Sequence, residues 1–138
     1  MIVATNQSGV GRGYFPESLV GTIHELMTQQ LAAAGAHLDA IYYCPHTSAD
    51  GCDCRKPKMG MLKRAAREHA IDLQGSFVVG DRYADVELAH RAGARSILVR
   101  TGYGEGEFLW NAPKWPLQPE FVAADLADAV HWILKAGK

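Results

Sequence analysis

The most distinctive pattern in the sequence is a short segment that contains every cysteine of the chain. Cys44 and His46 are one residue apart, Cys52 and Cys54 are one residue apart, and five residues separate the two pairs. Each pair can present two soft donors from one side of a turn, and two facing pairs complete the tetrahedron that zinc prefers. We therefore predict a structural zinc site in the loop 44–54, with no position left open for a catalytic water. The alternative is a set of free thiols in an exposed loop.

Two cations follow the last of these donors directly. Arg55 offers a planar fork that suits a phosphate group, and Lys56 offers a point charge for a developing negative oxygen. Pro57 then stiffens the exit from the loop. A metal in the preceding loop would hold both cations in place, so we predict that they bind phosphate. The alternative is an exposed basic pair without a function.

Two polar turns each follow an apolar stretch. Residues 2–4 are apolar, and the turn after them reads Thr5, Asn6, Gln7, Ser8. A glycine-ended polar loop at the carboxyl end of a parallel strand is typical of phosphate binding. This position predicts that the turn contacts a phosphate group.

The second turn, at 80–85, contains two carboxylates, Asp81 and Asp85. The carboxyl end of a parallel strand is where α/β enzymes place their chemistry. Asp81 is expected to bind a hard cation there, while Asp85 orients neighbouring groups without contacting the metal. The alternative for a lone strand-end aspartate is a helix N-cap.

Strands alternate with helices along the chain, and each strand is almost wholly apolar, which predicts a doubly wound parallel α/β sheet. The expected strands are 2–4, 40–43, 76–79, 96–99 and 121–123. The expected helices start at Pro16 and end before Gly35, and then cover 60–69, 84–92 and the segment after Asp125. Residues 103–120 are expected to form a long ordered loop.

The first and last helices each carry an apolar stripe that should be buried. In the first helix these residues are Leu19, Val20, Ile23, Leu26, Met27 and Leu31. In the last helix they are Leu126, Val130, Ile133 and Leu134.

Size and composition narrow the function classes. The chain has 138 residues with 48% hydrophobic and 21% charged residues, which suits one globular domain, 1–138. A net charge of −1 argues against a general nucleic-acid or membrane binder. No leader or membrane-spanning run is recognisable, so a cytoplasmic location is expected.

Taken together, TNQSG, CPHTSADGCDCRKP and VGDRYAD resemble the motifs of the haloacid-dehalogenase superfamily of aspartate-nucleophile phosphatases. The resemblance is closest to its D-glycero-D-manno-heptose-1,7-bisphosphate phosphatase branch and nearly as close to the histidinol-phosphate phosphatase branch. It covers essentially the whole chain. It implies a Rossmann-like parallel sheet with a zinc-binding loop, and magnesium-dependent hydrolysis of a small phosphorylated substrate.

The resemblance also implies a role for each matching residue. Thr5 and Asn6 would hold the transferring phosphoryl group, with Gln7 and Ser8 beside them. Lys56 would stabilise the phosphoryl transition state. The other implied roles are substrate recognition for Arg55, magnesium ligation for Asp81 and a backbone contribution to the metal site for Arg82.

One motif of the superfamily is absent from this sequence. The DxDGT motif supplies the nucleophilic aspartate, the general acid/base and further magnesium ligands, and the resemblance places it upstream of Met1. It would lie on a central strand between those that end at Thr5 and Asp81. The 138 residues by themselves are therefore expected to be inactive. A monomer is expected if the sheet is complete, and a strand-supplying partner if it is not.

The resemblance leaves two candidate substrates, a heptose bisphosphate and the amino-alcohol phosphate histidinol phosphate. A heptose bisphosphate is favoured because no second catalytic domain, often fused in the histidinol branch, is recognisable. A rival from another class is a zinc-bearing pseudoenzyme that binds a phosphorylated ligand or a partner protein without catalysis.

Overall fold

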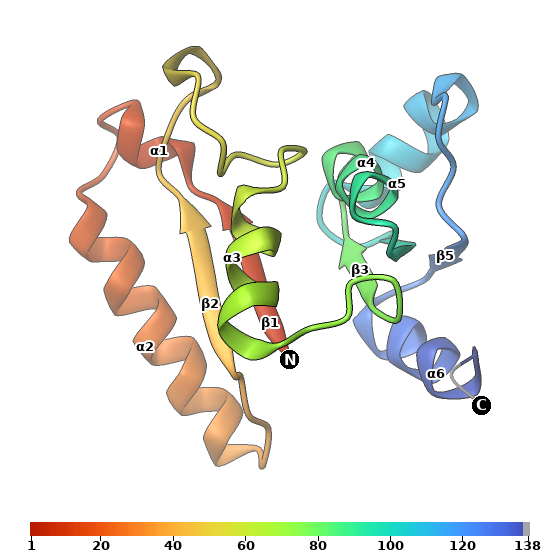
Figure 1. Ribbon diagram of the computed structural model, residues 1–138, viewed down its shortest axis with the longest axis horizontal. Coiled ribbons are helices and arrows are strands. Elements are labelled where there is room, and N and C mark those ends of the chain that lie inside the picture. Colours follow the sequence, from red (N-terminus) through yellow and green to blue (C-terminus); the bar gives the residue numbers. More distant parts are fainter. Residues whose placement is uncertain (137–138) are drawn as a thin grey trace. The chain divides into compact units, whose positions relative to one another are not determined.

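The computed structural model describes residues 1–136 and shows an α/β chain (Figure 1). Its strands are β1 (Ile2–Asn6), β2 (Ala40–Cys44), β3 (Phe77–Gly80), β4 (Arg95–Val99) and β5 (Phe121–Ala123). Its α-helices are α1 (Ser8–Gly11), α2 (Glu17–Ala33), α3 (Gly60–His69), α4 (Tyr83–Ala92), α5 (Gly104–Gly106) and α6 (Leu126–Ala136). The chain forms two compact units, Met1–Ala70 and the part from Ile71 onward, which are described in turn.

In the first unit, β1 and β2 form a parallel pair, in register from Ile2 opposite Ala40 to Asn6 opposite Cys44. Thr5 and Asn6, expected in the loop, instead complete β1. The crossover between the strands is α2, as parallel strands require. Every residue of β1 is only half-buried, although the strand begins with three apolar residues.

The predicted buried stripe of α2 is wrong at three positions. Val20 is buried, but Leu19, Ile23 and Leu26 are 41%, 53% and 53% exposed. A sheet of two strands is a narrow surface, so the unit covers only part of the apolar width of the helix.

In the second unit, β3, β4 and β5 form a parallel sheet with β4 in the middle. Because β4 has a neighbour on both sides, its residues from Ser96 to Val99 are all buried. A core of Ile97, Val99, Ala123 and Ala129 packs against aromatic side chains of the same unit.

The buried face of α6 also differs from the predicted stripe. Leu126, Val130 and Leu134 are 61%, 44% and 63% exposed, whereas Ala129 is fully buried. The sheet side of the helix is set by Trp132, whose ring stacks on Phe121 at 4.9 Å between centroids. This indole occupies the space over the strands, and the leucines therefore face away.

The parallel α/β class predicted from the sequence is confirmed. The expected long loop 103–120 is wrong in part, because it contains α5, a π-helical turn (Glu107–Asn111) and a 3₁₀ turn (Ala112–Lys114). Gly104 makes the first turn feasible, since a Cβ there would overlap the carbonyl oxygen of Val99. Among the described residues, no helix has the length and apolar character needed to cross a bilayer.

Candidate functional site

The loop after β2 brings the four predicted metal donors together. Cys44 Sγ lies 2.8 Å from Cys54 Sγ and 3.6 Å from Cys52 Sγ. His46 Nδ1 lies 3.2 Å from Cys54 Sγ, and all four donor atoms lie within 4.8 Å of one another. The cysteines form no disulfide. Zinc–sulfur bonds of about 2.3 Å in a tetrahedron separate two sulfurs by about 3.8 Å, so this donor set fits a zinc ion.

The close packing of the thiols shifts the pKa values of Cys52 and Cys54 in opposite directions. Burial and the neighbouring thiols of Cys44 and Cys52 raise the pKa of Cys54 to about 12. Burial also acts to raise that of Cys52, but hydrogen bonds from the Arg55 backbone and the other thiols lower its pKa to about 7. Because a metal binds the thiolate form, the lowered pKa of Cys52 favours metal binding, and a bound metal would favour deprotonation of its other cysteine ligands.

The turn between the two pairs has an order of its own that the sequence analysis missed. Thr47 and Asp50 form a capping box around the short 3₁₀ turn Ser48–Asp50, with Thr47 N donating to Asp50 Oδ2 at 2.6 Å. Gly51 follows in the left-handed conformation at φ +64°. The T-x-x-D spacing was the available signal.

We expect the purified protein to contain one zinc ion per chain and the Cys52→Ser variant to lose most of it. Replacing a thiolate by a hydroxyl removes a soft ligand, and without the ion the loop would become more open to proteases. Metal content by mass spectrometry, together with limited proteolysis within 44–54, measures both effects. Ser48→Ala, in the same loop but outside the donor set, is the matched control. Zinc-free wild-type protein with three titratable thiols would contradict the prediction.

The predicted phosphate-binding residues of the first unit meet at the end of β1. Asn6 Oδ1 accepts a hydrogen bond from Lys56 N at 3.0 Å, and Asn6 Nδ2 donates to Lys56 O at 3.2 Å. The ammonium of Lys56 donates to the carbonyl of Ala4 at 2.9 Å. Gln7 Nε2 donates to Thr5 Oγ1 at 3.1 Å. Two segments 50 residues apart thus form one polar group.

Hydrogen bonds join this group and Arg55 to the loop 44–54 (the metal loop). Gln7 N donates to Cys44 O at 2.7 Å, and Arg55 Nη1 donates to His46 O at 3.3 Å. Gly60, the first residue of α3, donates to Asp53 O at 3.0 Å, and a side chain at this glycine would overlap the Asp53 carbonyl. The metal loop is therefore braced against both β1 and α3. Ser8, at the start of α1, is half-buried beside the group.

In the second unit, Asp81 follows β3 directly, as predicted, and a second loop holds its carboxylate. Tyr103 N donates to Asp81 Oδ2 at 2.9 Å. Gly102 has φ +62°, and a Cβ at this position would overlap the same oxygen. The contact of this loop after β4 with Asp81 was not predicted from the sequence, where the Gly102–Gly104 spacing after an apolar strand was its signal.

Asp85, in the first turn of α4, caps the start of this helix. It is 5% exposed, and its Oδ2 accepts a hydrogen bond from Arg82 N at 3.2 Å. The guanidinium of Arg82 pairs with Glu107 at 3.2 Å and lies over the Tyr103 ring at 4.3 Å. Asp85 thus orders the Arg82 backbone.

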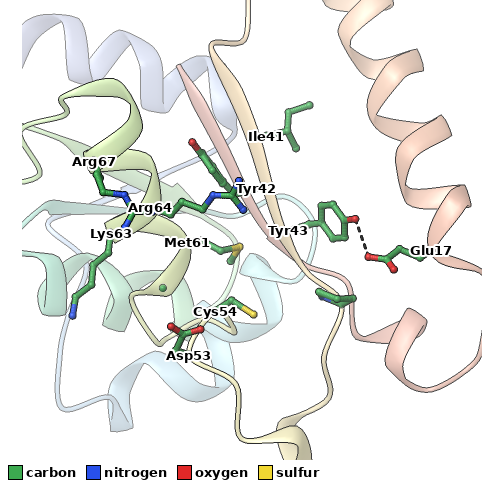
Figure 2. Close-up of a pocket in the computed structure, with 12 residues that line it drawn as sticks. Glu17, Ile41, Tyr42, Tyr43, Asp53, Cys54, Met61, Lys63, Arg64 and Arg67 are labelled. Carbon is green, nitrogen blue, oxygen red and sulfur yellow. Dashed lines mark hydrogen bonds between the residues drawn. The ribbon is translucent and has the colours of Figure 1, made fainter.

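An open cavity of about 770 Å³ lies in the first unit, beside β2 and α3 (Figure 2). Its lining includes Tyr42, Tyr43, Lys63, Arg64 and Arg67. The two tyrosine hydroxyls donate to glutamates, Tyr42 to Glu68 at 2.6 Å and Tyr43 to Glu17 at 2.8 Å. None of the predicted phosphate-binding residues lines the cavity, so it is distinct from the polar group at the end of β1.

Comparison with known proteins identifies the family of the chain. The HAD-hydrolase-like family model matches residues 53–129. A D-glycero-beta-D-manno-heptose-1,7-bisphosphate 7-phosphatase of Pseudomonas putida is 43% identical over 122 residues, which are 88% of this chain and 70% of the relative. The corresponding enzyme of Thermosynechococcus vestitus is 42% identical over 142 residues, covering 95% and 72%.

Among solved structures, D,D-heptose 1,7-bisphosphate phosphatase from Bordetella bronchiseptica, in complex with magnesium and phosphate, is similar with a TM-score of 0.87. It is 40% identical, and the match covers 98% of this chain and 74% of that one. The family resemblance predicted from the three motifs is confirmed. The chain belongs to the HAD-like hydrolase family and is one of its phosphoric monoester hydrolases.

Proposed function

We propose that the protein is a magnesium-dependent sugar-phosphate phosphatase that removes the 7-phosphate of D-glycero-D-manno-heptose 1,7-bisphosphate. The observation that carries the proposal is the polar group at the end of β1, where Asn6 and Lys56 are joined by two hydrogen bonds next to Thr5. The names of the relatives from Pseudomonas putida and Thermosynechococcus vestitus support the substrate. A structural zinc ion on the Cys44–Cys54 loop would keep Arg55 and Lys56 in place.

Each residue contributes a separate interaction to this reaction. Thr5, Gln7 and Ser8 would bind the phosphoryl oxygens beside Asn6, and Lys56 would stabilise the charge that develops on them. Arg55 would contact the part of the substrate that does not react. Magnesium, when bound, would neutralise charge on the transferring group.

Two residues of the second unit fit a magnesium site. Asp81 offers a carboxylate oxygen, the type of ligand that magnesium prefers. Arg82 would add its backbone, which Asp85 orders through the hydrogen bond to Arg82 N.

The nucleophile would come from a DxDGT segment upstream of Met1. Its first aspartate would attack phosphorus to form an aspartyl-phosphate. The bond from phosphorus to the sugar oxygen would break, the general acid of the same motif would protonate that oxygen, and water would then hydrolyse the aspartyl-phosphate. Two features of the described residues support a further strand. β1 pairs only with β2, β3 pairs only with β4, and both of these apolar strands are merely half-buried, unlike β4. A parallel strand in an α/β sheet is normally covered on both edges and faces.

The experiment that tests this function measures phosphate release by the protein carrying its natural upstream segment, with magnesium. A higher kcat/KM on heptose 1,7-bisphosphate than on histidinol phosphate supports the proposal, and the reverse order favours the histidinol-phosphate alternative. Ligand binding without release from either substrate would favour a zinc-bearing pseudoenzyme.

We expect Gly102→Ala to raise the magnesium concentration required for half-maximal turnover about tenfold, because misplaced supports of metal ligands typically cost 10- to 100-fold in affinity. The new methyl group would push on Asp81 Oδ2, and φ +62° is strained for alanine. The matched control is Gly106→Ala, since a Cβ there meets no atom within 4 Å. Equal magnesium dependence in both variants would show that the loop does not hold the ligand.

A further inference from the structure

We infer that Asn6 acts chiefly as a positioning residue for Lys56, an inference that rests on the proposed phosphatase function. Asn6 is the last residue of β1 and is half-buried. Its side-chain amide binds the Lys56 backbone at two points, accepting from Lys56 N at 3.0 Å and donating to Lys56 O at 3.2 Å. The amide thereby imitates the pairing between two strands, and it fixes both the distance and the orientation of the Lys56 backbone.

A third contact extends this arrangement to the lysine side chain. Lys56 Nζ donates to the carbonyl of Ala4 at 2.9 Å, so the ammonium lies along the last residues of β1. Ala4 and Asn6 flank Thr5, the residue expected to bind the transferring phosphoryl group. The backbone and the ammonium of Lys56 are both hydrogen-bonded to the carboxyl end of β1. The position of Lys56 relative to Thr5, on the same strand, is therefore fixed.

The metal loop alone does not provide this registration. Its last donor is Cys54, and Arg55 is tied to the loop through His46 O at 3.3 Å. Lys56 comes after both, and its backbone N–H donates to Asn6 Oδ1. The metal loop therefore brings the segment near β1, whereas Asn6 sets the final position of Lys56.

The chemistry of the amide explains why asparagine suits this position. The pairing requires one donor and one acceptor on a short side chain. Aspartate would keep the bond from Lys56 N but would place a second oxygen against the Lys56 carbonyl. Alanine would remove both bonds. The Asn6 amide nitrogen donates to Lys56 O. It is therefore not directed at a phosphate group.

The first test measures steady-state kinetics of Asn6 variants in the zinc-loaded protein with its upstream segment. We expect Asn6→Ala to lower kcat about 10- to 100-fold, the cost of a misplacement of about 1 Å, with little change in KM. Asn6→Asp should fall between wild type and Asn6→Ala. The matched control is Gln29→Glu, the same amide-to-acid change on the exposed face of α2, which should leave kinetics unchanged.

A double-mutant cycle separates positioning from direct phosphate binding. If Asn6 acts through Lys56, Asn6→Ala should have little further effect on kcat in the Lys56→Ala background. If Asn6 is instead a direct ligand of the substrate, its effect should persist there and appear mainly in KM. That second result would overturn the inference.

Hydrogen exchange of the Lys56 amide, measured by NMR, gives a readout that needs no activity. The exchange should be markedly faster in Asn6→Ala than in wild type or Gln29→Glu, and close to wild type in Asn6→Asp, which retains the acceptor. Unchanged exchange of the Lys56 amide in Asn6→Ala would overturn the inference that Asn6 positions Lys56. If the parent protein released no phosphate, the proposed function would fail. The exchange measurement would still show whether Asn6 positions the Lys56 backbone. Should Asn6→Ala not fold, Asn6→Asp replaces it in the kinetic tests, where wild-type kcat would overturn the inference.

Discussion

The isolated 138-residue polypeptide should release no phosphate above background from heptose 1,7-bisphosphate or histidinol phosphate. The same chain extended by its natural upstream codons should hydrolyse the heptose bisphosphate with magnesium. The physical reason is that the short chain contains no DxDGT segment, and so lacks the expected nucleophile, the general acid/base and most of the magnesium ligands. Asp81 alone would bind magnesium weakly, since this ion retains its waters unless several oxygen ligands replace them.

The structure also shows that other carboxylates are engaged elsewhere. These are Asp39 with the Met1 amino group, Asp50 with Thr47, Asp72 with Gln74 N, Asp85 with Arg82 N, and Asp128 with Ala124 N. Each serves a local turn, cap or terminus, and such a role does not present an oxygen to a phosphorus atom.

A third protein separates loss of chemistry from loss of folding. The extended chain with the first aspartate of its DxDGT motif replaced by asparagine should retain the fold of the active protein but release no phosphate. Circular dichroism and thermal unfolding check the fold, and phosphate release checks the chemistry. Comparable turnover by the short and extended chains would refute the argument and would place the nucleophile among the residues described above.

Lys56→Ala in the extended protein should lower kcat about 100-fold or more, while KM changes much less. Removing one preorganised group that stabilises transition-state charge typically costs a factor of about 10² to 10³ in kcat. The ammonium is held at the end of β1 by Ala4 O, so its position is available before substrate binds. Only a group whose interaction strengthens in the transition state affects kcat in this way.

Two variants serve as references for this measurement. Lys63→Ala removes a lysine from the exposed surface of α3 and should leave kcat unchanged. Arg55→Ala should mainly change the preference between substrates, because its guanidinium is assigned to parts that do not react. If Lys56→Ala raised KM alone, the lysine would be a substrate-binding residue and its assigned role would be wrong.

Much of this protein could be derived from its sequence because the relevant signals are local. The alternation of apolar strands with helices predicted the parallel sheets, since a strand buried on both faces must be apolar throughout. The spacing of Cys44, His46, Cys52 and Cys54 predicted the donor cluster, since eleven residues suffice to close the loop around an ion. The prediction that Arg55 and Lys56 follow the last metal donor, Cys54, likewise depends on adjacent residues alone.

Other features were decided only by the tertiary structure. The pairing of Asn6 with Lys56 joins residues 50 positions apart, and it depends on the register of β1 against β2 and on the path of the metal loop. The cradle of Asp81 comes from Gly102 and Tyr103, on a loop that follows a different strand.

The exposed leucines of α2 and α6 show the same limit. An apolar pattern along a helix shows which faces could be buried. In α2 the width of the sheet determines which residues are buried, and in α6 the bulk of Trp132 does. Periodicity along a chain is a property of neighbouring residues, whereas burial and long-range hydrogen bonds depend on what distant segments bring to the same place. The sequence by itself therefore determined the family, the metal loop and the expected chemistry, and the tertiary structure decided which groups hold that chemistry in position.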